Sequence, residues 1–287
     1  MNAILEKKQL SDEVYLMRIR APLIAEERQP GQFVILQVDE DYGERIPLTI
    51  ADADPNEGWI MIVFQTVGKT THALAELGEG DAVAALVGPL GKPTHIEHYG
   101  TVVCVGGGIG VAPLHPIAQA LKRAGNRLIV ILGARSRNLI VLEDRMRAIA
   151  DELIVCTDDG SYGMKALVTG PLKEICERAP KPDLAVAIGP PIMMKACADL
   201  TRGYHVPIVV SLNSIMIDGT GMCGGCRVSV GGKTRFTCVD GPEFDGHLVD
   251  FDLLMKRLRA YKRHEDEAHE KCHLEMQVRN AKPKART

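Results

Sequence analysis

The sequence predicts an antiparallel β-barrel followed by an α/β domain with a five-stranded, doubly wound parallel sheet. Three observations carry this prediction. Residues 1–97 hold short apolar segments closed by turn residues, residues 98–212 alternate apolar strands with helical segments, and residues 213–250 form a glycine-rich stretch with three cysteines. Residues 251–287 follow as a charged helix with a basic tail. These four ranges are the expected domains.

Composition limits the kind of protein that this chain can be. It has 287 residues, of which 46% are hydrophobic and 25% charged, as is ordinary for a globular protein of two or three units. The net charge of −3 gives no electrostatic reason to bind nucleic acid or an anionic membrane. The first residues carry charges throughout, and no apolar run reaches the ~18 residues of a membrane span. We expect a cytoplasmic protein whose cysteines serve metal binding or packing rather than disulfides.

Five candidate strands make up the expected barrel. Each is a short apolar run bounded by Gly, Pro, Asn or Asp, and this spacing is typical of a small closed barrel. The strands are expected at residues 14–21, 31–38, 47–52, 58–68 and 81–91. One short helix is expected at residues 71–77, and no other helix fits between these strands.

From residue 101 onward, apolar strands alternate with segments of helical periodicity. Near-continuous apolar runs indicate strands that are covered by helices on both faces of a parallel sheet. These runs are residues 101–105, 127–132, 152–156, 183–189 and 206–212. Four scattered cysteines, Cys104, Cys156, Cys176 and Cys197, are interpreted as small core residues.

A glycine-rich turn joins the first parallel strand to its helix. Small residues there let the backbone approach a pyrophosphate, with the helix N-terminus facing the charge. The alternative is a tight strand–helix connection that needs only small residues. The position after the first strand of a parallel sheet favours a dinucleotide site. Its expected residues are Gly106, Gly107, Gly108 and Gly110, joined by Gly189 and Pro190 at the end of the fourth strand.

The residues that follow the second and third strands indicate whether the site prefers NAD(H) or NADP(H). The second strand is followed by Arg135 and Arg137 rather than by the acidic residue that is usual in NAD sites. Guanidinium groups suit the 2′-phosphate of NADP(H), although both arginines could equally be solvated loop residues. Asp158 and Asp159 follow the third strand, where they could face the nicotinamide half or form a turn.

Two barrel segments, GERIPLTI and TVGKTTHAL, also stand out. Arg45 could hold a cofactor phosphate, and Thr49 could present its hydroxyl to a flavin edge. Gly68, Thr70 and Thr71 precede the expected helix and could form a second phosphate cradle. Taken alone, each of these segments is more typical of an ordinary turn.

The stretch from residue 216 to 246 carries the C-x2-C and the distant cysteine of a plant-type ferredoxin loop. Cys223, Cys226 and Cys238 take these three positions, and Asp218 stands where the first cysteine of the pattern belongs. Zinc is the rival metal, because C-x2-C is also half of a zinc knuckle. No second C-x2-C or histidine pair completes a zinc set, and His247 is the nearby imidazole. The glycine-dense spacing therefore favours iron, with Asp218 either a fourth ligand or an ordinary Asp-Gly turn.

The order of these segments resembles the ferredoxin–NADP reductase superfamily, in the branch that contains the electron-transfer subunit of dihydroorotate dehydrogenase. More closely, it is similar to the small subunits of the NADH-dependent reduced ferredoxin:NADP+ oxidoreductases, also known as sulfide dehydrogenase β subunits. The resemblance covers nearly the whole chain outside the basic tail. It rests on GERIPLTI, VGKTTHAL, GGGIGVAPL, TDDGSYG, IGPPIMMK, DGTGMCGGCRVSVGG and CVDGPEFDGHLVDF.

The resemblance implies an FAD site in the barrel, where RIPLT stands in place of the superfamily's R-x-Y-S. Thr49 takes the Ser position near the flavin N5, and Leu48 takes the Tyr position that usually stacks on the ring, with Pro47 between Ile46 and Leu48. Strict alignment puts Ile46 at the Arg position, so Arg45 lies one residue early for its expected role at the pyrophosphate.

The resemblance also implies a [2Fe–2S] cluster. This branch includes members whose cluster has one Asp and three Cys ligands, which match Asp218, Cys223, Cys226 and Cys238. Dihydroorotate dehydrogenase subunits use four cysteines, so Asp218 separates the two groups.

The implied activity is electron relay between NAD(H) or NADP(H), FAD and the cluster, with the cofactors rather than an acid–base pair doing the chemistry. The implied partner is a larger flavin and iron–sulfur subunit that resembles the glutamate synthase small subunit, with ferredoxin reached through the complex, and electron bifurcation is the implied activity of the whole. Two alternatives remain: an electron-transfer subunit of dihydroorotate dehydrogenase, and a non-catalytic nucleotide-binding module with a zinc site.

Overall fold

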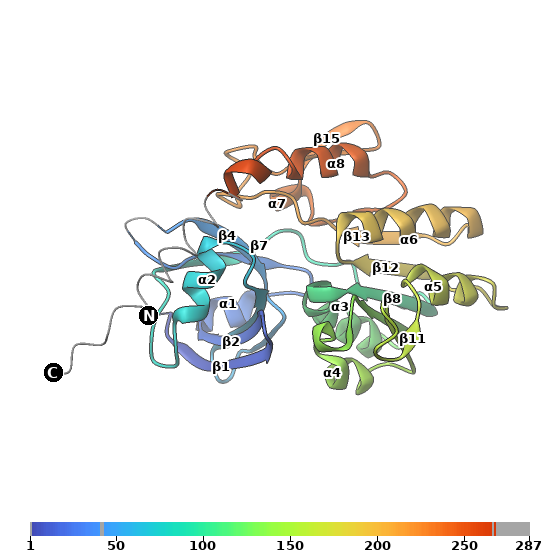
Figure 1. The fold of residues 1–287 in the computed structure, drawn as a ribbon, viewed down its shortest axis with the longest axis horizontal. Helices are drawn as coiled ribbons and strands as arrows, with labels where there is room; N and C mark the ends of the chain where they lie inside the picture. The colour runs from blue at the N-terminus through green and yellow to red at the C-terminus, as the bar shows by residue number, and fades with distance from the viewer. Residues whose placement is uncertain (1, 41–42, 266, 268–287) are drawn as a thin grey trace.

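The computed structural model describes residues 2–40, 43–265 and 267. Its ribbon shows two large lobes side by side, built from the N-terminal and the middle parts of the chain (Figure 1). A smaller subdomain from the C-terminal part lies above the place where the lobes meet. Among the described residues, none of the helices combines the length and the apolar character that crossing a membrane requires.

The N-terminal lobe consists of two antiparallel sheets around a common core, which confirms the predicted β-barrel class. The four-stranded sheet has the order β1-β2-β6-β5, and the three-stranded sheet has the order β4-β3-β7. Met17 and Ile60 of the first sheet and Val34 of the second are fully buried in this core. The strands are β1 (Ile4–Ser11), β2 (Val14–Arg20), β3 (Phe33–Gln37), β4 (Arg45–Thr49), β5 (Asp52–Asp54), β6 (Trp59–Gln65) and β7 (Ala85–Leu90).

Helix α1 (Pro22–Glu27) and strand β1 of this lobe are absent from the sequence prediction, and β5 overlaps the predicted strand at residues 47–52 only at Asp52. Helix α1 has only six residues and begins at a proline, whose fixed φ suits a first helical turn. Strand β1 is rich in Lys, Glu and Gln because it lies at the sheet edge, where most of its side chains face solvent. Helix α2 (Lys69–Glu76) is the short helix that the sequence predicts.

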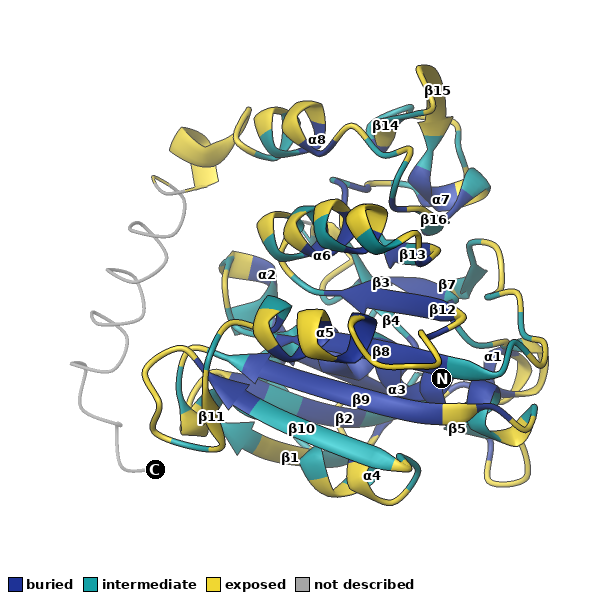
Figure 2. Ribbon diagram, turned by 90° about the vertical axis from the view of Figure 1, so that its right-hand side faces the viewer, coloured by how far each residue is buried: buried dark blue, intermediate teal, exposed yellow. Residues whose placement is uncertain are grey.

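The middle lobe contains a seven-stranded sheet with the order β11-β10-β9-β8-β12-β13-β16. Its five central strands are parallel and are the five predicted ones. In Figure 2, β8 and β9 are buried along most of their length, as expected for strands covered on both faces. The strands are β8 (Thr101–Gly107), β9 (Arg127–Ala134), β10 (Glu152–Thr157), β11 (Met164–Lys165), β12 (Leu184–Ile188) and β13 (Ile208–Ser211).

Helices cover both faces of this sheet, and the four core cysteines of the prediction are all fully buried. Burial raises the pKa of the Cys104 and Cys197 thiols to about 12, so both stay protonated core residues. The helices are η1 (Gly108–Gly110), α3 (Val111–Arg123), η2 (Arg137–Leu139), α4 (Glu143–Arg147), α5 (Thr169–Cys176) and α6 (Pro191–Tyr204).

The C-terminal subdomain joins the middle lobe through its own strand. It contains the hairpin β14 (Arg227–Val230) and β15 (Lys233–Phe236), the short helix α7 (Thr237–Asp240), strand β16 (Glu243–Asp245) and helix α8 (Phe251–Leu258). Strand β16 pairs antiparallel with β13 and becomes the seventh strand of the sheet. A turn at residues 259–261 interrupts the predicted helix after α8, and helix resumes at residues 262–265. Residues 266 and 268–287 of the predicted helix and tail lie outside the described residues.

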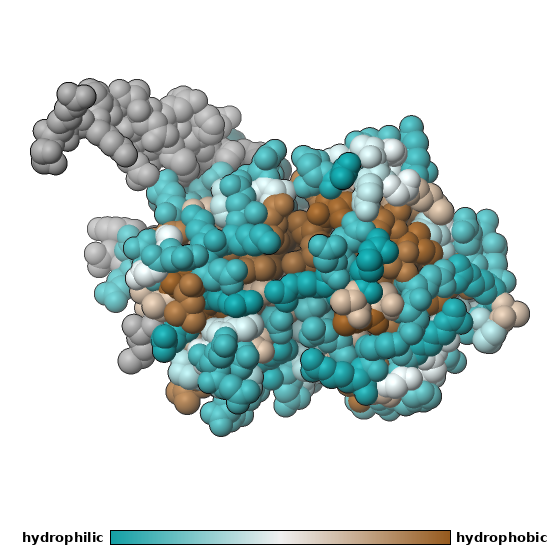
Figure 3. Space-filling model, turned by 90° about the horizontal axis from the view of Figure 1, so that it is seen from below, coloured by the Kyte–Doolittle hydropathy of each residue, from teal (hydrophilic) through white to brown (hydrophobic). Residues whose placement is uncertain are grey.

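Buried clusters join the three parts into one body. Ala51 and Met61 of the barrel share a core with Val111 and Leu114 of the middle lobe. Each large apolar side chain contributes about 1.5–3 kcal/mol when it is fully buried. On the face seen from below, apolar residues gather along the middle of the molecule, and polar residues lie on either side of them (Figure 3). The relative position of the lobes is therefore held by a hydrophobic core as well as by polar contacts.

Candidate functional site: a thiol loop, a flavin strand and a nucleotide-binding edge

The cysteine loop winds through several left-handed backbone positions. Gly219, Gly221 and Gly224 have φ values of 76°, 86° and 64°, which side chains other than glycine rarely adopt. These turns bring the thiols of Cys226 and Cys238 to within 3.2 Å of each other, and both cysteines are almost completely buried. Two sulfurs are thus held close together beneath the loop.

Asp218 lies at the start of the same loop and organises its backbone. Its carboxylate accepts hydrogen bonds from the N–H groups of Thr220, at 3.1 Å, and Cys223, at 2.8 Å. Desolvation would raise the pKa of Asp218, but these backbone donors outweigh it and lower the pKa. The carboxylate is therefore anionic at neutral pH, and two donors leave part of its acceptor capacity free.

Cys223 lies at the exposed rim of the loop, and its Sγ accepts the N–H of Gly225 at 3.4 Å. Within the described part of the chain, no three His, Cys, Asp or Glu side chains already have the arrangement of a metal site. The loop thus holds two sulfurs together while Cys223 and Asp218 stay on its rim. Three thiols and a carboxylate in a glycine-rich loop fit a [2Fe–2S] cluster, because backbone freedom lets the rim donors close around it.

His247 does not add an imidazole to the three cysteines, as a zinc knuckle would require. Its Nε2 pairs with the Thr201 hydroxyl at 3.0 Å. It lines a hollow of about 570 Å³ at the amino ends of β12 and β13, together with Arg202 and Asp245. This hollow contains none of the predicted site residues. His247 is therefore engaged away from the cysteine loop.

Two residues that spacing could not reveal hold the loop in place. The buried Thr237 donates its backbone N–H and its hydroxyl to the Cys226 carbonyl, at 3.1 and 3.0 Å. Arg257 of α8 donates to the Gly225 carbonyl at 3.1 Å. Neither residue lies in the cysteine pattern, so only the tertiary structure identifies it.

The RIPLT segment forms β4, which lies at one edge of its sheet, next to β3. An edge position suits Pro47, because proline has no N–H for a second strand neighbour. Thr49 pairs with Phe33, and Pro47 pairs with Ile35, both on β3. Arg45 is exposed at the start of the strand, whereas the other four residues of β4 are half-buried.

The GKTT segment forms the N-terminus of α2. The Thr71 hydroxyl accepts the N–H groups of Val67 and Gly68, at 3.0 and 3.1 Å, and so caps its own helix. Thr70 instead donates to the carboxylate of Glu44, at 2.8 Å, just before β4. This bond ties the two barrel segments together, and Glu44 is a residue that the sequence analysis does not single out.

The glycine-rich turn lies at the carboxyl end of β8, as a dinucleotide site requires. A Cβ on Gly110 would lie 2.3 Å from the carbonyl oxygen of Ile188 in β12, so only glycine fits this approach of α3 to the sheet. A Cβ on Gly189 would lie 3.1 Å from the Gly107 Cα. The structure thus brings the two predicted glycine sets together at one edge of the sheet.

A hollow of about 470 Å³ lies beside the ends of β9 and β10, with Arg137, Asp159 and Ser161 among its lining residues. Arg137 packs over the Tyr162 ring, 5.3 Å from its centre, and its N–H donates to the Ser161 hydroxyl. Asp159 accepts from the same serine, and this hydroxyl lowers the pKa of Asp159. One cation and one carboxylate therefore share the region where the sequence predicts selection between NAD and NADP. Arg135 does not line this hollow, whereas Asp158 lies next to Asp159 in the adjoining turn.

The thiol loop lies directly against the β4-β3-β7 sheet. Cys226 and Cys238 share a buried cluster with Phe33 and Ile35 of β3. These two residues pair with Thr49 and Pro47 of β4, so one strand separates the buried sulfurs from the RIPLT segment. Redox groups bound at the loop and at β4 would be close neighbours.

Comparisons with known proteins agree with this arrangement. Residues 213–250 match the family model of the iron–sulfur cluster binding domain of dihydroorotate dehydrogenase B. A dihydroorotate dehydrogenase B (NAD(+)) electron transfer subunit homolog from Thermotoga maritima is 49% identical over 94% of this chain and 95% of its own length. The electron transfer subunit of dihydroorotate dehydrogenase B from Geobacillus thermodenitrificans is 33% identical, covering 84% of this chain and 94% of the relative.

A solved structure is similar along nearly the whole chain. It was described as giving insights into flavin-based electron bifurcation through the NADH-dependent reduced ferredoxin-NADP oxidoreductase. The matching chain is 48% identical, with a TM-score of 0.90, over 94% of this chain and 97% of that one.

Proposed function

Because the chain belongs to the family of dihydroorotate dehydrogenase B electron-transfer subunits and their homologues, we propose that it is a flavin- and iron–sulfur-dependent oxidoreductase subunit. It passes electrons between a nicotinamide nucleotide, FAD and a [2Fe–2S] cluster, to or from a larger partner. The observation that carries this proposal is the packing of Cys226 and Cys238 against the strand that pairs with β4. The expected ranges 1–97, 98–212, 213–250 and 251–287 are kept as its proposed domains.

The chain's own residues bind and orient the cofactors. Arg45, Leu48, Thr49 and the α2 turn are the proposed flavin contacts, and the glycines around Gly107 and Gly189 are proposed to receive the pyrophosphate. When bound, the nicotinamide and flavin exchange a hydride, and the cluster carries single electrons. Short separations between sites matter because a hydride moves only between atoms that are nearly in contact.

Asp218, Cys223, Cys226 and Cys238 are the proposed cluster ligands. The buried sulfur pair and the left-handed glycines of the loop support this assignment. We propose a larger flavin and iron–sulfur subunit, similar to the glutamate synthase small subunit, as partner. The complex would be an electron-bifurcating ferredoxin:NAD(P)+ oxidoreductase, in line with the 48% identical structure. All seven cysteines of the described residues are free, which supports a reducing, cytoplasmic location.

A second candidate is the electron-transfer subunit of a dihydroorotate dehydrogenase, which the names of two relatives favour. Identification of the subunit that copurifies with the chain separates the two candidates. A glutamate synthase-like subunit supports the bifurcating complex, and a dihydroorotate oxidase subunit supports the second candidate.

The first test is the cofactor content of the protein purified without oxygen. We expect a yellow-brown protein with FAD, iron and labile sulfide, whose flavin is bleached by NADH or NADPH. Zinc in place of iron, together with absent flavin, would overturn both candidates in favour of a non-catalytic module.

A further inference from the structure

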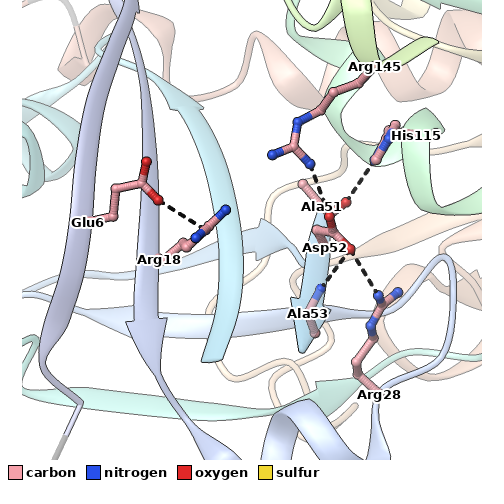
Figure 4. A network of polar contacts seen from close by, with 8 residues as sticks. All are labelled: Glu6, Arg18, Arg28, Ala51, Asp52, Ala53, His115 and Arg145. Atoms are coloured by element: carbon pink, nitrogen blue, oxygen red, sulfur yellow. Dashed lines mark hydrogen bonds and ion pairs between the residues drawn. The ribbon is translucent and has the colours of Figure 1, made fainter. Parts of the chain in front are cut away.

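Asp52 of β5 forms a polar bridge between the barrel and the middle lobe (Figure 4). Its Oδ2 accepts from Arg145 of α4 at 3.0 Å, and its Oδ1 lies 3.5 Å from Arg28, which follows α1. The Asp52 side chain is 22% exposed, Arg28 15% and Arg145 35%, so the bridge is partly removed from water. Ion pairs in such surroundings are screened less than exposed ones.

A second contact lies beside this bridge. His115, in the second turn of α3, is almost completely buried, and its Nδ1 lies 3.2 Å from the Ala51 carbonyl oxygen. Burial lowers the pKa of His115, so the ring is neutral and donates Nδ1–H to this carbonyl. Ala51 and Asp52 thus attach the same short segment of the barrel to two helices of the other lobe.

The position of this segment connects the bridge to the proposed reaction. Ala51 and Asp52 follow Thr49, the residue proposed at the flavin, by two and three positions. Helix α3 begins where the glycine-rich turn ends, and α4 follows the Arg135–Arg137 loop. One carboxylate therefore links the proposed flavin strand to the helices that follow two proposed nucleotide-binding turns.

We propose that Asp52, through Arg145, is a positioning residue that sets the nucleotide-binding lobe against the flavin strand. This inference rests on the proposed function. Two guanidinium groups face the single carboxylate, and Arg123 adds further positive charge near Arg28. Removing the carboxylate leaves like charges on the two lobes, which repel each other and loosen the contact.

Loosening the contact would slow hydride transfer more than it would destabilise the fold. Reacting atoms must come within about 3–3.5 Å, and a misplacement of about 1 Å can cost about a hundredfold in rate. The hydrophobic core between the lobes, with Ala51, Met61, Val111 and Leu114, is untouched by the substitution and keeps them together.

The test compares Asp52→Asn, Arg145→Met and Arg145→Lys in the cofactor-loaded protein. Asparagine keeps the acceptor for the Ala53 N–H, and lysine keeps the positive charge of Arg145. Glu152→Gln is the matched control, because it removes the Arg178–Glu152 ion pair, at 2.7 Å, inside a single lobe. Hydrogen–deuterium exchange of residues 49–53 and 111–118, FAD and iron content, and the rate of flavin reduction at saturating NADH are measured together.

We expect Asp52→Asn and Arg145→Met to slow flavin reduction by about tenfold or more while retaining FAD and iron. In the same two variants, hydrogen–deuterium exchange should be faster at residues 49–53 and 111–118. Arg145→Lys should have a flavin-reduction rate and an exchange rate close to those of the wild type. Glu152→Gln should change neither rate. Unchanged exchange and rate in Asp52→Asn, or a loss of rate that only follows lost FAD, would overturn the inference. If NADH and NADPH both fail to reduce the wild-type flavin, the proposed function fails, and the exchange data still decide whether the bridge holds the lobes.

Discussion

The sulfur atoms of Cys226 and Cys238 lie 3.2 Å apart beneath the glycine-rich loop, although the two residues are 12 positions apart. Burial raises the pKa of the Cys238 thiol to about 12, and its neighbour Cys226 adds to this effect. Ionising the Cys238 thiol in this pocket is costly, and a bound cation would offset this cost. The pair is therefore better suited to holding a metal centre than to reacting as free thiols.

Substituting either member of this pair should remove the cluster. We expect Cys226→Ser and Cys238→Ser to lose most of their iron and labile sulfide while retaining FAD, because each loses a soft thiolate ligand. Iron and sulfide analysis after reconstitution checks this. Cys176→Ala, at a buried cysteine outside the loop, should keep full iron content. Normal iron in both serine variants would show that the cluster lies elsewhere.

Asp218→Asn tests whether the carboxylate is a ligand. The Thr220 and Cys223 N–H groups bond to different oxygens of Asp218, so asparagine keeps an acceptor for one of them and loses the anionic oxygen. We expect an altered EPR spectrum and a shifted reduction potential. Asp218→Cys should instead restore a stable cluster with the spectrum of four thiolates. If Asp218→Asn and Asp218→Ala both keep the wild-type iron content, spectrum and potential, the carboxylate only organises the turn.

Arg137 and Asp159 should act in opposite directions on nucleotide choice. Arg137→Ala removes a cation near the hollow, so we expect NADPH to bind about 10- to 100-fold more weakly, with little change for NADH. Asp159→Asn removes a negative charge that disfavours a 2′-phosphate, so NADPH should bind more tightly. Titration of both nucleotides against both variants measures this. Parallel changes for NADH and NADPH would contradict a role in discrimination.

Glu243 should make stability depend on pH. Burial raises its pKa from 4.5 to about 7, while the Thr94 hydroxyl, at 2.6 Å, opposes the shift. The folded state thus binds the proton more tightly than the unfolded state. The stabilisation is fully present below about pH 4.5 and is lost as the pH rises through about 7.

Glu243→Gln keeps an acceptor for Thr94 but has no proton to lose. Relative to this variant, the wild type should lose about 1–3 kcal/mol of unfolding free energy between about pH 4.5 and about pH 7. Urea unfolding across this range provides the measurement. The exposed Glu26→Gln should stay within about 0.5 kcal/mol of the wild type. A pH-independent difference between wild type and Glu243→Gln would show that Glu243 titrates normally.

Gly110→Ala should destabilise the fold at the nucleotide edge. Its Cβ would meet the Ile188 carbonyl oxygen at 2.3 Å, and a clash with backbone in a packed region costs about 1–3 kcal/mol. Gly203→Ala in α6 has no atom within 4 Å of its new Cβ, so it should instead stabilise by about 0.5–1 kcal/mol. Denaturant midpoints of the two variants should therefore move in opposite directions, and equal shifts would contradict this.

Much of the fold follows from local sequence pattern. The five parallel strands are continuous apolar runs, and burial on both faces of a sheet produces that pattern. Strand β16 lies in the turn-like sequence GPEFDG, and its extended form depends on pairing with β13. Helix α1 is too short for periodicity to reveal, and the charged β1 follows the rule for sheet edges rather than for cores.

The candidate site also combines features that the local sequence predicts with features that only the tertiary structure reveals. The cysteine spacing, the glycine-rich turn and the RIPLT segment are local signals, so the sequence alone indicates them. Asp52 and Arg145 are 93 positions apart, and Arg257 is 32 positions from Gly225. No local pattern connects such pairs, because each pair meets only after distant segments of the chain have folded against one another.

Because β16 pairs with β13, the segment that carries the thiol loop depends on the middle lobe for its structure. The cluster-bearing segment contributes a strand to its neighbour's sheet, and its following helix α8 is tied to α6 through Lys195 and Asp252, at 2.7 Å. Grafting residues 213–250 onto another reductase would leave both connections behind. A chimaera that keeps the thiol loop folded would have to include β13 as well. The cluster-binding segment should therefore be exchanged between relatives together with the middle lobe.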